Sequence, residues 1–170
     1  MKNFEITREI GIDMAHRVTH HGSKCRNLHG HRYTIQATCC GQLAEDGEQQ
    51  GMVLDFGFLK QIMMEEIDLP CDHGLCLWIQ DPWVDIIARD RLFHESSIVR
   101  NGYSHVERMF DNANTGGKFY IVPFVPTAEN LAKHWFERML TPVADASGGK
   151  ARLSRVRVYE TPNCWSDYPA

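Results

Sequence analysis

Three histidines and one cysteine near the start of the chain have the residue types and spacing of a metal-dependent catalytic site. His29 and His31 open a run of alternating apolar and polar residues, and His16 ends an earlier alternating run. Residues two apart on a strand point to the same face, so His29 and His31 can bind one ion. If the two runs pair as a hairpin, all three rings meet at one end of a sheet. Three imidazoles leave a coordination position open, as in catalytic zinc sites.

Zinc is the expected ion, although an all-nitrogen ligand set also binds other divalent metals and affinity alone does not select among them. Gly30, between two of the ligands, suits the arrangement because glycine lets the backbone approach closely. The alternative is that these are ordinary surface or packing histidines, since a single His-x-His pattern is only weakly specific for metal.

Cys25 lies four residues before His29 and has Lys24 and Arg26 as neighbours. A cation or an imidazolium beside a thiol favours the thiolate, which is the reactive form. We therefore expect Cys25 to be a reactive thiol next to the metal. The alternative is that Cys25 is the fourth ligand of a structural zinc site, which would be closed and inert.

Asp72 and His73 form a second candidate feature at the end of a predicted helix. An aspartate that orients a histidine, which in turn exchanges a proton with a thiol, is the arrangement of an activated nucleophile. Adjacent residues do not easily hydrogen-bond ring to carboxylate, so this pair needs a bend or a separate anchor for Asp72. A histidine stabilised by the helix dipole is the alternative.

Two glutamates stand out by their positions. Glu129 falls in the first turn of a predicted helix, where a favourable charge on the helix dipole is the plain explanation. Glu160 ends a predicted strand, and a carboxylate there could accept the paired N–H donors of a guanidine-like heterocycle edge. Either side chain could instead be merely solvated.

Hydrophobic periodicity predicts the elements that position these residues. Alternating apolar residues predict strands over residues 4–14 and 33–39. Asp55 is a good N-cap for an amphipathic helix that ends before Pro70. The strand that ends at His16 and the strand that begins at His29 are expected to pair.

Further strands are predicted over residues 119–124 and 153–159, with a second long helix capped by Thr127 between them. Residues 78–118 are interpreted as an insertion or lid, with a helix over residues 83–93. The whole chain is interpreted as one domain. The order of strands and helices indicates an α+β fold with a largely antiparallel sheet.

Composition limits the class of protein. The 170 residues are 43% hydrophobic and 24% charged, which is typical of a soluble globular domain. A net charge of −4 argues against a nucleic-acid partner. No apolar run predicts a signal peptide or a membrane span, so a cytoplasmic location with six free thiols is expected.

Six short motifs occur in order along the chain: Ala15-His16-Arg17, Cys25-Arg26-Asn27-Leu28-His29-Gly30-His31, Met52-Val53-Leu54-Asp55-Phe56, Asp72-His73, Pro126-Thr127-Ala128-Glu129-Asn130 and Val158-Tyr159-Glu160-Thr161. Together they resemble the 6-pyruvoyltetrahydropterin synthase and 6-carboxytetrahydropterin synthase family. The short gap between Cys25 and His29 is similar to that of the bacterial carboxytetrahydropterin synthases of the queuosine pathway.

The resemblance implies a tunnelling fold, in which an antiparallel sheet carries two main helices on one face and closes into a barrel as a homo-oligomer. Active sites then lie between subunits. The implied reaction is a zinc-dependent lyase step that converts 7,8-dihydroneopterin triphosphate to 6-carboxy-5,6,7,8-tetrahydropterin, with loss of triphosphate and acetaldehyde.

The resemblance also implies residue roles. These are zinc binding by His16, His29 and His31, catalysis by Cys25, Asp72, His73 and Glu160, and substrate binding by Asn27, Thr127, Glu129 and Glu160. Cys25 would accept a proton, and Asp72 and His73 would relay charge to it from a neighbouring subunit.

One departure from the family pattern concerns the product. About fifty residues separate His73 from Pro126, where family members usually have a short loop. A pyruvoyl-type product therefore stays an alternative. So does a non-catalytic pterin- or purine-binding module with a structural zinc.

Overall fold

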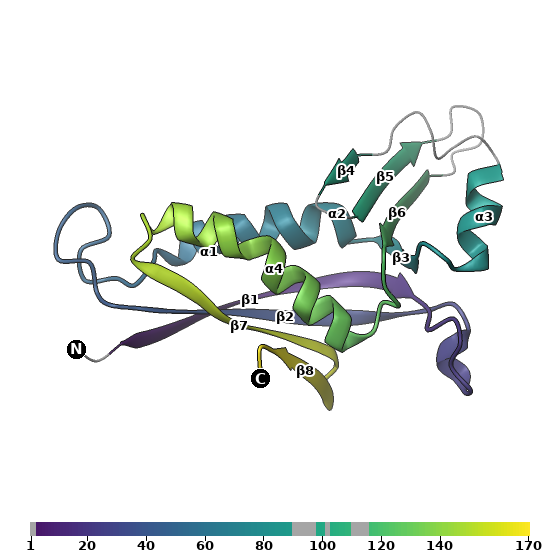
Figure 1. Ribbon diagram of the computed structural model, residues 1–170, viewed down its shortest axis with the longest axis horizontal. Helices are drawn as coiled ribbons and strands as arrows, with labels where there is room; N and C mark the ends of the chain where they lie inside the picture. Colours follow the sequence, from purple (N-terminus) through teal and green to yellow (C-terminus); the bar gives the residue numbers. More distant parts are fainter. Residues whose placement is uncertain (1–2, 90–97, 101–102, 110–115) are drawn as a thin grey trace.

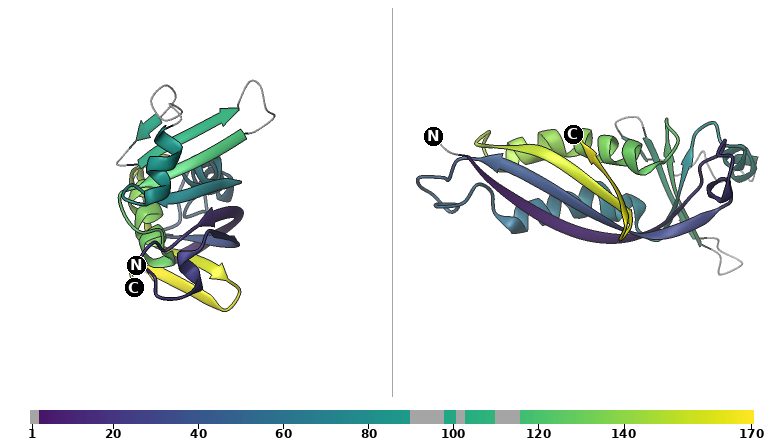
Figure 2. Two further views of the ribbon diagram at one scale, coloured as in Figure 1. Left: turned by 90° about the vertical axis from the view of Figure 1, so that its right-hand side faces the viewer. Right: turned by 90° about the horizontal axis from the view of Figure 1, so that it is seen from below.

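The computed structural model of the chain describes residues 3–89, 98–100, 103–109 and 116–170. In this part of the chain, eight strands form one curled sheet in the spatial order β4-β5-β6-β3-β1-β2-β7-β8 (Figures 1 and 2). The strands are β1 (Phe4–His16), β2 (His29–Gly41), β3 (Gly74–Trp78), β4 (Ile98–Arg100), β5 (Tyr103–Met109), β6 (Gly116–Val122), β7 (Ala151–Thr161) and β8 (Cys164–Tyr168).

Helices α1 and α4 cover one face of the long strands β1, β2 and β7 (Figure 1). The described helices are η1 (Lys24–Arg26, a 3₁₀ turn), α1 (Phe56–Met63), η2 (Met64–Asp68, a π-helical segment), α2 (Leu69–Cys71), α3 (Pro82–Arg89) and α4 (Ala128–Ala146). Ile12 and Ile35 from the sheet and Leu131 and Trp135 from α4 are fully buried in the core between these layers.

The predicted hairpin is confirmed and its register decides where the histidines lie. His16 is directly opposite His29, and Met14 is opposite His31. Opposite residues of an antiparallel pair share a face, so the three rings continue the buried row that includes Ile12. This alternation places the histidines on the helix-covered face, at the end of the hairpin.

Both predicted N-caps are confirmed. The Asp55 side chain accepts the Gly57 and Phe58 N–H groups, and the Thr127 side chain accepts the Asn130 N–H. Helix α1 ends at Met63, before Pro70 as predicted, but the chain stays helical through η2 and α2, which was not predicted. The π-helical segment interrupts regular hydrogen bonding, so Pro70 stands in the first turn of α2, where its missing N–H costs little.

The predicted largely antiparallel sheet is found in part: the other described strand pairs are antiparallel, but β3 pairs in parallel with both β1 and β6. The helical segment after β2 runs back along the sheet, so the strand that follows it points the same way as β1. The sequence did not predict β3, whose five residues lack clean alternation, and its burial pattern does not alternate either.

The segment interpreted as an insertion contributes to the same sheet. Helix α3 overlaps the predicted 83–93 helix but begins one residue earlier, at Pro82, and β5 pairs antiparallel with β6. The part of the interpretation that concerns residues 90–97 and 110–115 lies outside the described residues. Beyond Glu160, where the sequence predicted no further element, β8 pairs antiparallel with β7.

Two further expectations can be compared with the structure. All six cysteines are free, as predicted, and Cys39, Cys40, Cys71 and Cys76 are buried in the core. None of the described helices combines the length and the apolar character that crossing a bilayer requires.

Candidate metal centre and active site

The three predicted metal-binding histidines form one compact cluster. Each of His16, His29 and His31 offers a ring nitrogen, and these three atoms lie within 4.8 Å of one another. The ring centroids are 4.6 to 5.3 Å apart. Ligand atoms this close to one another can hold a single metal ion, and among the described His, Cys, Asp and Glu side chains these three histidines form such a group.

Backbone carbonyls orient two of the rings. His16 Nδ1 lies 2.8 Å from the carbonyl oxygen of Pro126, and His29 Nδ1 lies 2.8 Å from that of Asn27. A carbonyl only accepts, so Nδ1 carries the proton on both rings and Nε2 keeps its lone pair. Metal-binding histidines commonly have such a carbonyl on the other ring nitrogen.

The Nε2 atoms of His16 and His31 show whether the cluster suits a metal ion. Both are buried and have no hydrogen-bond partner among the described residues. Burial lowers the pKa of His16 and of His31, and so favours the neutral imidazole that binds a metal. The donor set and the two buried nitrogens that make no hydrogen bond fit a divalent ion such as Zn²⁺.

Glu160, on β7, reaches the histidine cluster. Its Oε1 lies 3.4 Å from His16 Nε2 and 3.9 Å from His31 Nε2, and its side chain is 30% exposed. The structure therefore brings Glu160 to the centre from a position far away in the sequence. The carboxylate is open on one side to a bound molecule.

Tyr33 was missed by the sequence reasoning. It is fully buried, its ring packs edge-on against His16 and His31, and its hydroxyl has no hydrogen-bond partner among the described residues. Burial and the nearby Glu160 carboxylate raise the pKa of Tyr33, so the hydroxyl stays protonated. Its place two residues after His31, in the same alternating row, was the available signal.

Cys25 lies in the η1 turn on the loop between β1 and β2. The side chain is half-buried, and the Cys25 carbonyl accepts the Val18 N–H at 2.9 Å. The thiol is not part of the group of ligand atoms that lie within 4.8 Å of one another. The cluster thus consists of three imidazoles, with the thiol on an adjoining loop.

Asp72 and His73 contact each other directly, at 2.7 Å from Oδ2 to Nδ1. The expectation that adjacent residues do not easily pair in this way is corrected. His73 has a left-handed backbone with φ of 56°, which turns its ring back over the preceding carboxylate. Burial raises the pKa of Asp72, but hydrogen bonds from the Asp13 N–H and the His73 ring outweigh it and hold the pKa below its usual value.

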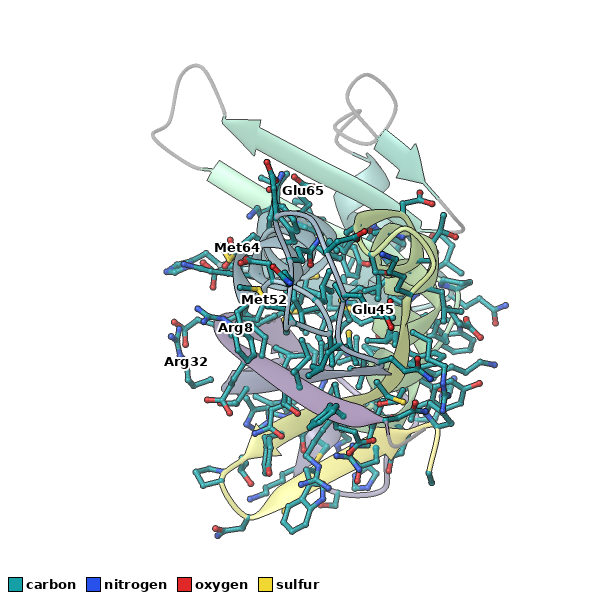
Figure 3. The ribbon with its side chains drawn as sticks, turned by 90° about the vertical axis from the view of Figure 1, so that its left-hand side faces the viewer. Arg8, Arg32, Glu45, Met52, Met64 and Glu65 are labelled. Carbon is teal, nitrogen blue, oxygen red and sulfur yellow. The ribbon has the colours of Figure 1, made fainter. Side chains whose placement is uncertain are left out.

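The pair lies beside β1, where β3 begins, and its side chains are not part of the group of ligand atoms that the histidine cluster forms. A cavity of about 490 Å³ beside His73 is lined by Ala15, Gly30 and Arg32, which alternate with the metal-site residues along their strands, and also by His31. The Arg32 side chain points away from the body of the protein (Figure 3). His73 is 77% exposed. Within one chain, the pair is therefore not brought together with His16.

The remaining predicted residues have local structural roles. Asn27 is exposed and orients His29 through its carbonyl. Thr127 caps α4, and Pro126 just before it orients His16. Glu129 is exposed in the first turn of α4, as the helix-dipole explanation predicts.

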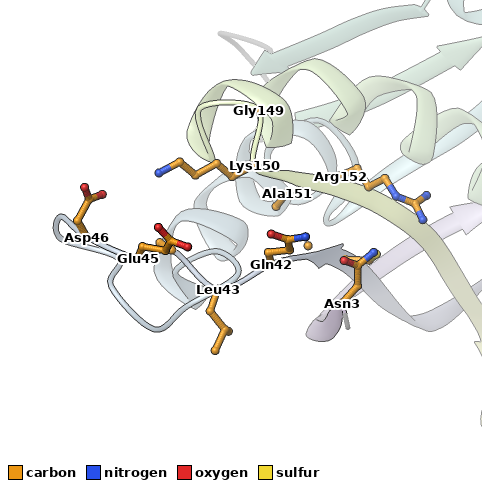
Figure 4. A pocket seen from close by; sticks show the side chains of 12 residues that line it. Asn3, Gln42, Leu43, Glu45, Asp46, Gly149, Lys150, Ala151 and Arg152 are labelled. Atoms are coloured by element: carbon orange, nitrogen blue, oxygen red, sulfur yellow. The ribbon is translucent and has the colours of Figure 1, made fainter. Parts of the chain in front are cut away.

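A second cavity, of about 520 Å³, lies at the opposite end of the hairpin (Figure 4). Its lining includes Gln42, Glu45, Lys150 and Arg152. None of the candidate metal-binding or catalytic residues lines it, so we do not assign it to the reaction.

Comparison with known proteins gives the family. Residues 5–170 match the 6-pyruvoyl tetrahydropterin synthase family. The chain belongs to this family. Membership confirms the resemblance inferred from the motifs.

Two relatives from bacteria match almost the whole of this pterin synthase family member. The 6-carboxy-5,6,7,8-tetrahydropterin synthase of Haemophilus influenzae is 30% identical over 165 residues, which cover 97% of this chain and 98% of the relative. The enzyme of the same name from Rickettsia felis is 31% identical over 159 residues, covering 94% and 95%. The protein is therefore an enzyme of the pterin synthase type, a lyase.

Solved structures show the same fold. An uncharacterized protein from Wolinella succinogenes matches with a TM-score of 0.78 at 23% identity, covering 98% of both chains. The 6-pyruvoyl tetrahydropterin synthase of Plasmodium vivax matches with a TM-score of 0.63 at 16% identity, covering 98% of this chain and 97% of the other. The curled sheet with few helices is thus the family fold.

Proposed function

We propose that the protein is a zinc-dependent lyase that converts 7,8-dihydroneopterin triphosphate and water to 6-carboxy-5,6,7,8-tetrahydropterin, triphosphate and acetaldehyde. The observation that carries the proposal is the cluster of His16, His29 and His31, in which the buried Nε2 atoms of His16 and His31 make no hydrogen bond with the described residues. The bacterial relatives named for this product support the choice of reaction.

The three histidines would hold the zinc, with Pro126 and Asn27 fixing two of the rings. Bound there, zinc would act as a Lewis acid that polarises side-chain hydroxyls of the substrate and makes the adjacent C–H bonds more acidic. The chain's own residues must then bind the ring, accept protons and exclude water.

Cys25 would accept a proton from the substrate side chain. A thiolate on the η1 turn can reach a side chain held at the cluster, because η1 is joined to His29 by only two residues. Asp72 would keep the His73 ring oriented through the 2.7 Å contact, and His73 would exchange the proton with Cys25.

Asp72 and His73 would act on Cys25 of a neighbouring subunit in a homo-oligomer. The 77% exposure of the His73 side chain supports this arrangement, because an exposed ring can contact a neighbouring chain. Such a site is complete only in the assembled oligomer.

Glu160 would bind the pterin ring. Its carboxylate can accept two N–H donors from the guanidine-like edge of the pterin in a bidentate arrangement. A ring bound by Glu160, which is partly exposed beside the cluster, would have its side chain near the three histidines. Asn27, Thr127 and Glu129 would support the substrate from the adjoining loop and helix start.

Product analysis tests the proposal. The zinc-loaded protein is incubated with 7,8-dihydroneopterin triphosphate, and both triphosphate and acetaldehyde are measured. Release of both in equal amounts is expected. Triphosphate without acetaldehyde would show a pyruvoyl-type reaction, and absence of both would overturn the lyase proposal.

Alkylation separates this proposal from a binding module with a structural zinc. A catalytic Cys25 should react faster than the other five thiols, and Cys25→Ala should keep stoichiometric zinc but lose turnover. Loss of zinc in that variant, or protection of Cys25 by the metal, would instead identify Cys25 as a structural ligand.

A further inference from the structure

Asp81 is a buried carboxylate that neither the motifs nor the proposed chemistry uses. It follows β3 and precedes α3, at the point where the 78–118 segment begins. The residue is 2% exposed, and its side chain is completely buried. A charge that far from water needs partners, so the identity of those partners shows what Asp81 holds in place.

The partners of the Asp81 side chain come mainly from the loop between β1 and β2. Oδ2 accepts the Thr19 hydroxyl and lies 3.2 Å from Nε of Arg17. Oδ1 accepts the Trp83 N–H at 2.9 Å, which fixes the carboxylate to the start of α3. One carboxylate thus joins the start of α3 to two residues that follow the His16 ligand.

The same loop carries Cys25. Val18, between Arg17 and Thr19, donates its N–H to the Cys25 carbonyl at 2.9 Å. Arg17 and Thr19 therefore fix the loop to Asp81 on both sides of Val18, the residue that is bonded to the Cys25 turn. The His20 ring also packs edge-on against Trp78, 5.7 Å between centroids. Figures 1 and 2 show this loop and α3 at the same end of the molecule.

We propose that Asp81 is a positioning residue that sets the place of Cys25 relative to the histidine cluster. The catalytic consequence of this inference rests on the proposed lyase reaction. The anchoring of the β1–β2 loop by Asp81 does not depend on that reaction. Arg17 is bound to Asp81, so its charge serves the loop and not the substrate.

The predicted effect is on turnover, with metal and substrate binding retained. His16, His29 and His31 are held by the β1–β2 register, which Asp81 does not contact. Asp81→Asn keeps an oxygen for Thr19 but loses the charge that pairs with Arg17. A proton acceptor displaced by about 1 Å can cost on the order of 100-fold in rate.

The experiment compares the zinc-loaded wild type with Asp81→Asn, Asp81→Glu, Thr19→Val and the control Asp85→Asn. Asp85 is an exposed carboxylate in the first turn of α3, four residues from Asp81. The measurements are zinc content, kcat, KM and the hydrogen-exchange rate of the Val18 amide, which needs no substrate.

Asp81→Asn should keep one zinc and a KM within about threefold of wild type, while kcat falls by about 100-fold. Its Val18 amide should exchange about tenfold faster or more, since the loop opens locally. Asp81→Glu, which restores the charge, should recover part of kcat, and Thr19→Val should show a smaller loss of kcat. Asp85→Asn should match wild type.

Unchanged kcat and unchanged Val18 exchange in Asp81→Asn would overturn the proposal. Loss of zinc, or a rise in KM that matches the fall in kcat, would also overturn it by showing a general structural role. If Asp81→Asn does not fold, Thr19→Val decides by the same criteria. If the wild type itself has no lyase activity, the proposed function fails, and Val18 exchange still decides whether Asp81 anchors the loop.

Discussion

The backbone N–H of Asp13 donates to Oδ1 of Asp72 at 2.8 Å, which joins a strand of the hairpin to the end of the first helical segment. The carbonyl of Asp13 also accepts the His73 N–H at 2.7 Å. One residue of β1 thus holds the Asp72-His73 pair through both of its backbone groups. Because the backbone groups of a strand point to its neighbour in the sheet, the pair is held beside β1, where β3 begins.

Complementation between subunits tests this geometry. Cys25→Ala and His73→Ala should each be inactive as purified variants. Mixed oligomers of the two should regain up to about a quarter of wild-type activity, because one intact Cys25 and one intact neighbouring His73 then meet at about a quarter of the interfaces. Activity is measured before and after co-refolding. Mixtures that stay inactive would show that each chain uses its own pair.

Metal removal gives the second prediction. Adding zinc to the metal-free protein at about 100 times its Kd should stabilise the fold by about 2.7 kcal/mol and raise the melting temperature by roughly 5 to 10 °C. His29→Ala should lose most of this shift, because two nitrogens remain. His21→Ala, an exposed histidine outside the cluster, is the matched control and should retain it. Equal shifts in the two variants would exclude the cluster as the zinc site.

The third prediction concerns the triphosphate. Arg17 pairs with Asp81, and Arg32 pairs with Asp13 at 2.6 Å. Lys24 and Arg26 are exposed, flank Cys25 and have no salt bridge to a described acid. These two cations are therefore available to bind the anionic end of the substrate.

Lys24→Ala and Arg26→Ala should each raise KM by about tenfold at low salt, which is about 1.4 kcal/mol of binding free energy. The effect should shrink as salt screens the charges. Arg32→Ala should change KM by less than about twofold, since its charge is already paired. A larger rise in Arg32→Ala than in Lys24→Ala would contradict this assignment.

The fourth prediction concerns stability at acid pH. His134 is buried on α4, and its Nε2 lies 2.6 Å from the Tyr120 hydroxyl. Burial and the nearby Arg138 lower the pKa of His134 from 6.5 to about 3. Between these values the unfolded chain binds a proton at this residue and the folded chain does not. Stability is therefore lost as the pH falls from about 6.5 towards 3.

Chemical denaturation at pH 7, 6 and 5 measures this effect. His134 should contribute up to about 1.4 kcal/mol to the fall in unfolding free energy for each pH unit below 6.5. His134→Gln has no such titration, so its stability should depend less steeply on pH. Parallel pH dependences in the two proteins would show that His134 is not the responsible group.

Local patterns in the sequence were enough to predict the hairpin, both helix caps and the convergence of the three histidines. A period of two residues assigns each side chain to a face, and Asp55 and Thr127 satisfy the free N–H groups of the next turn. Because His16, His29 and His31 lie on two strands joined by a short loop, their convergence needs little beyond the hairpin register. The six motifs, together with these positions, were enough to recognise the family.

Only the tertiary structure decided which distant segments reach that site. Glu160 approaches His16 and His31 across the sheet, Pro126 orients His16, and Asp81 holds the Cys25 loop. The parallel pairing of β3 was missed for the same reason. Periodicity tells which face of an element is buried, but the pairing of elements far apart depends on how all their buried faces pack together.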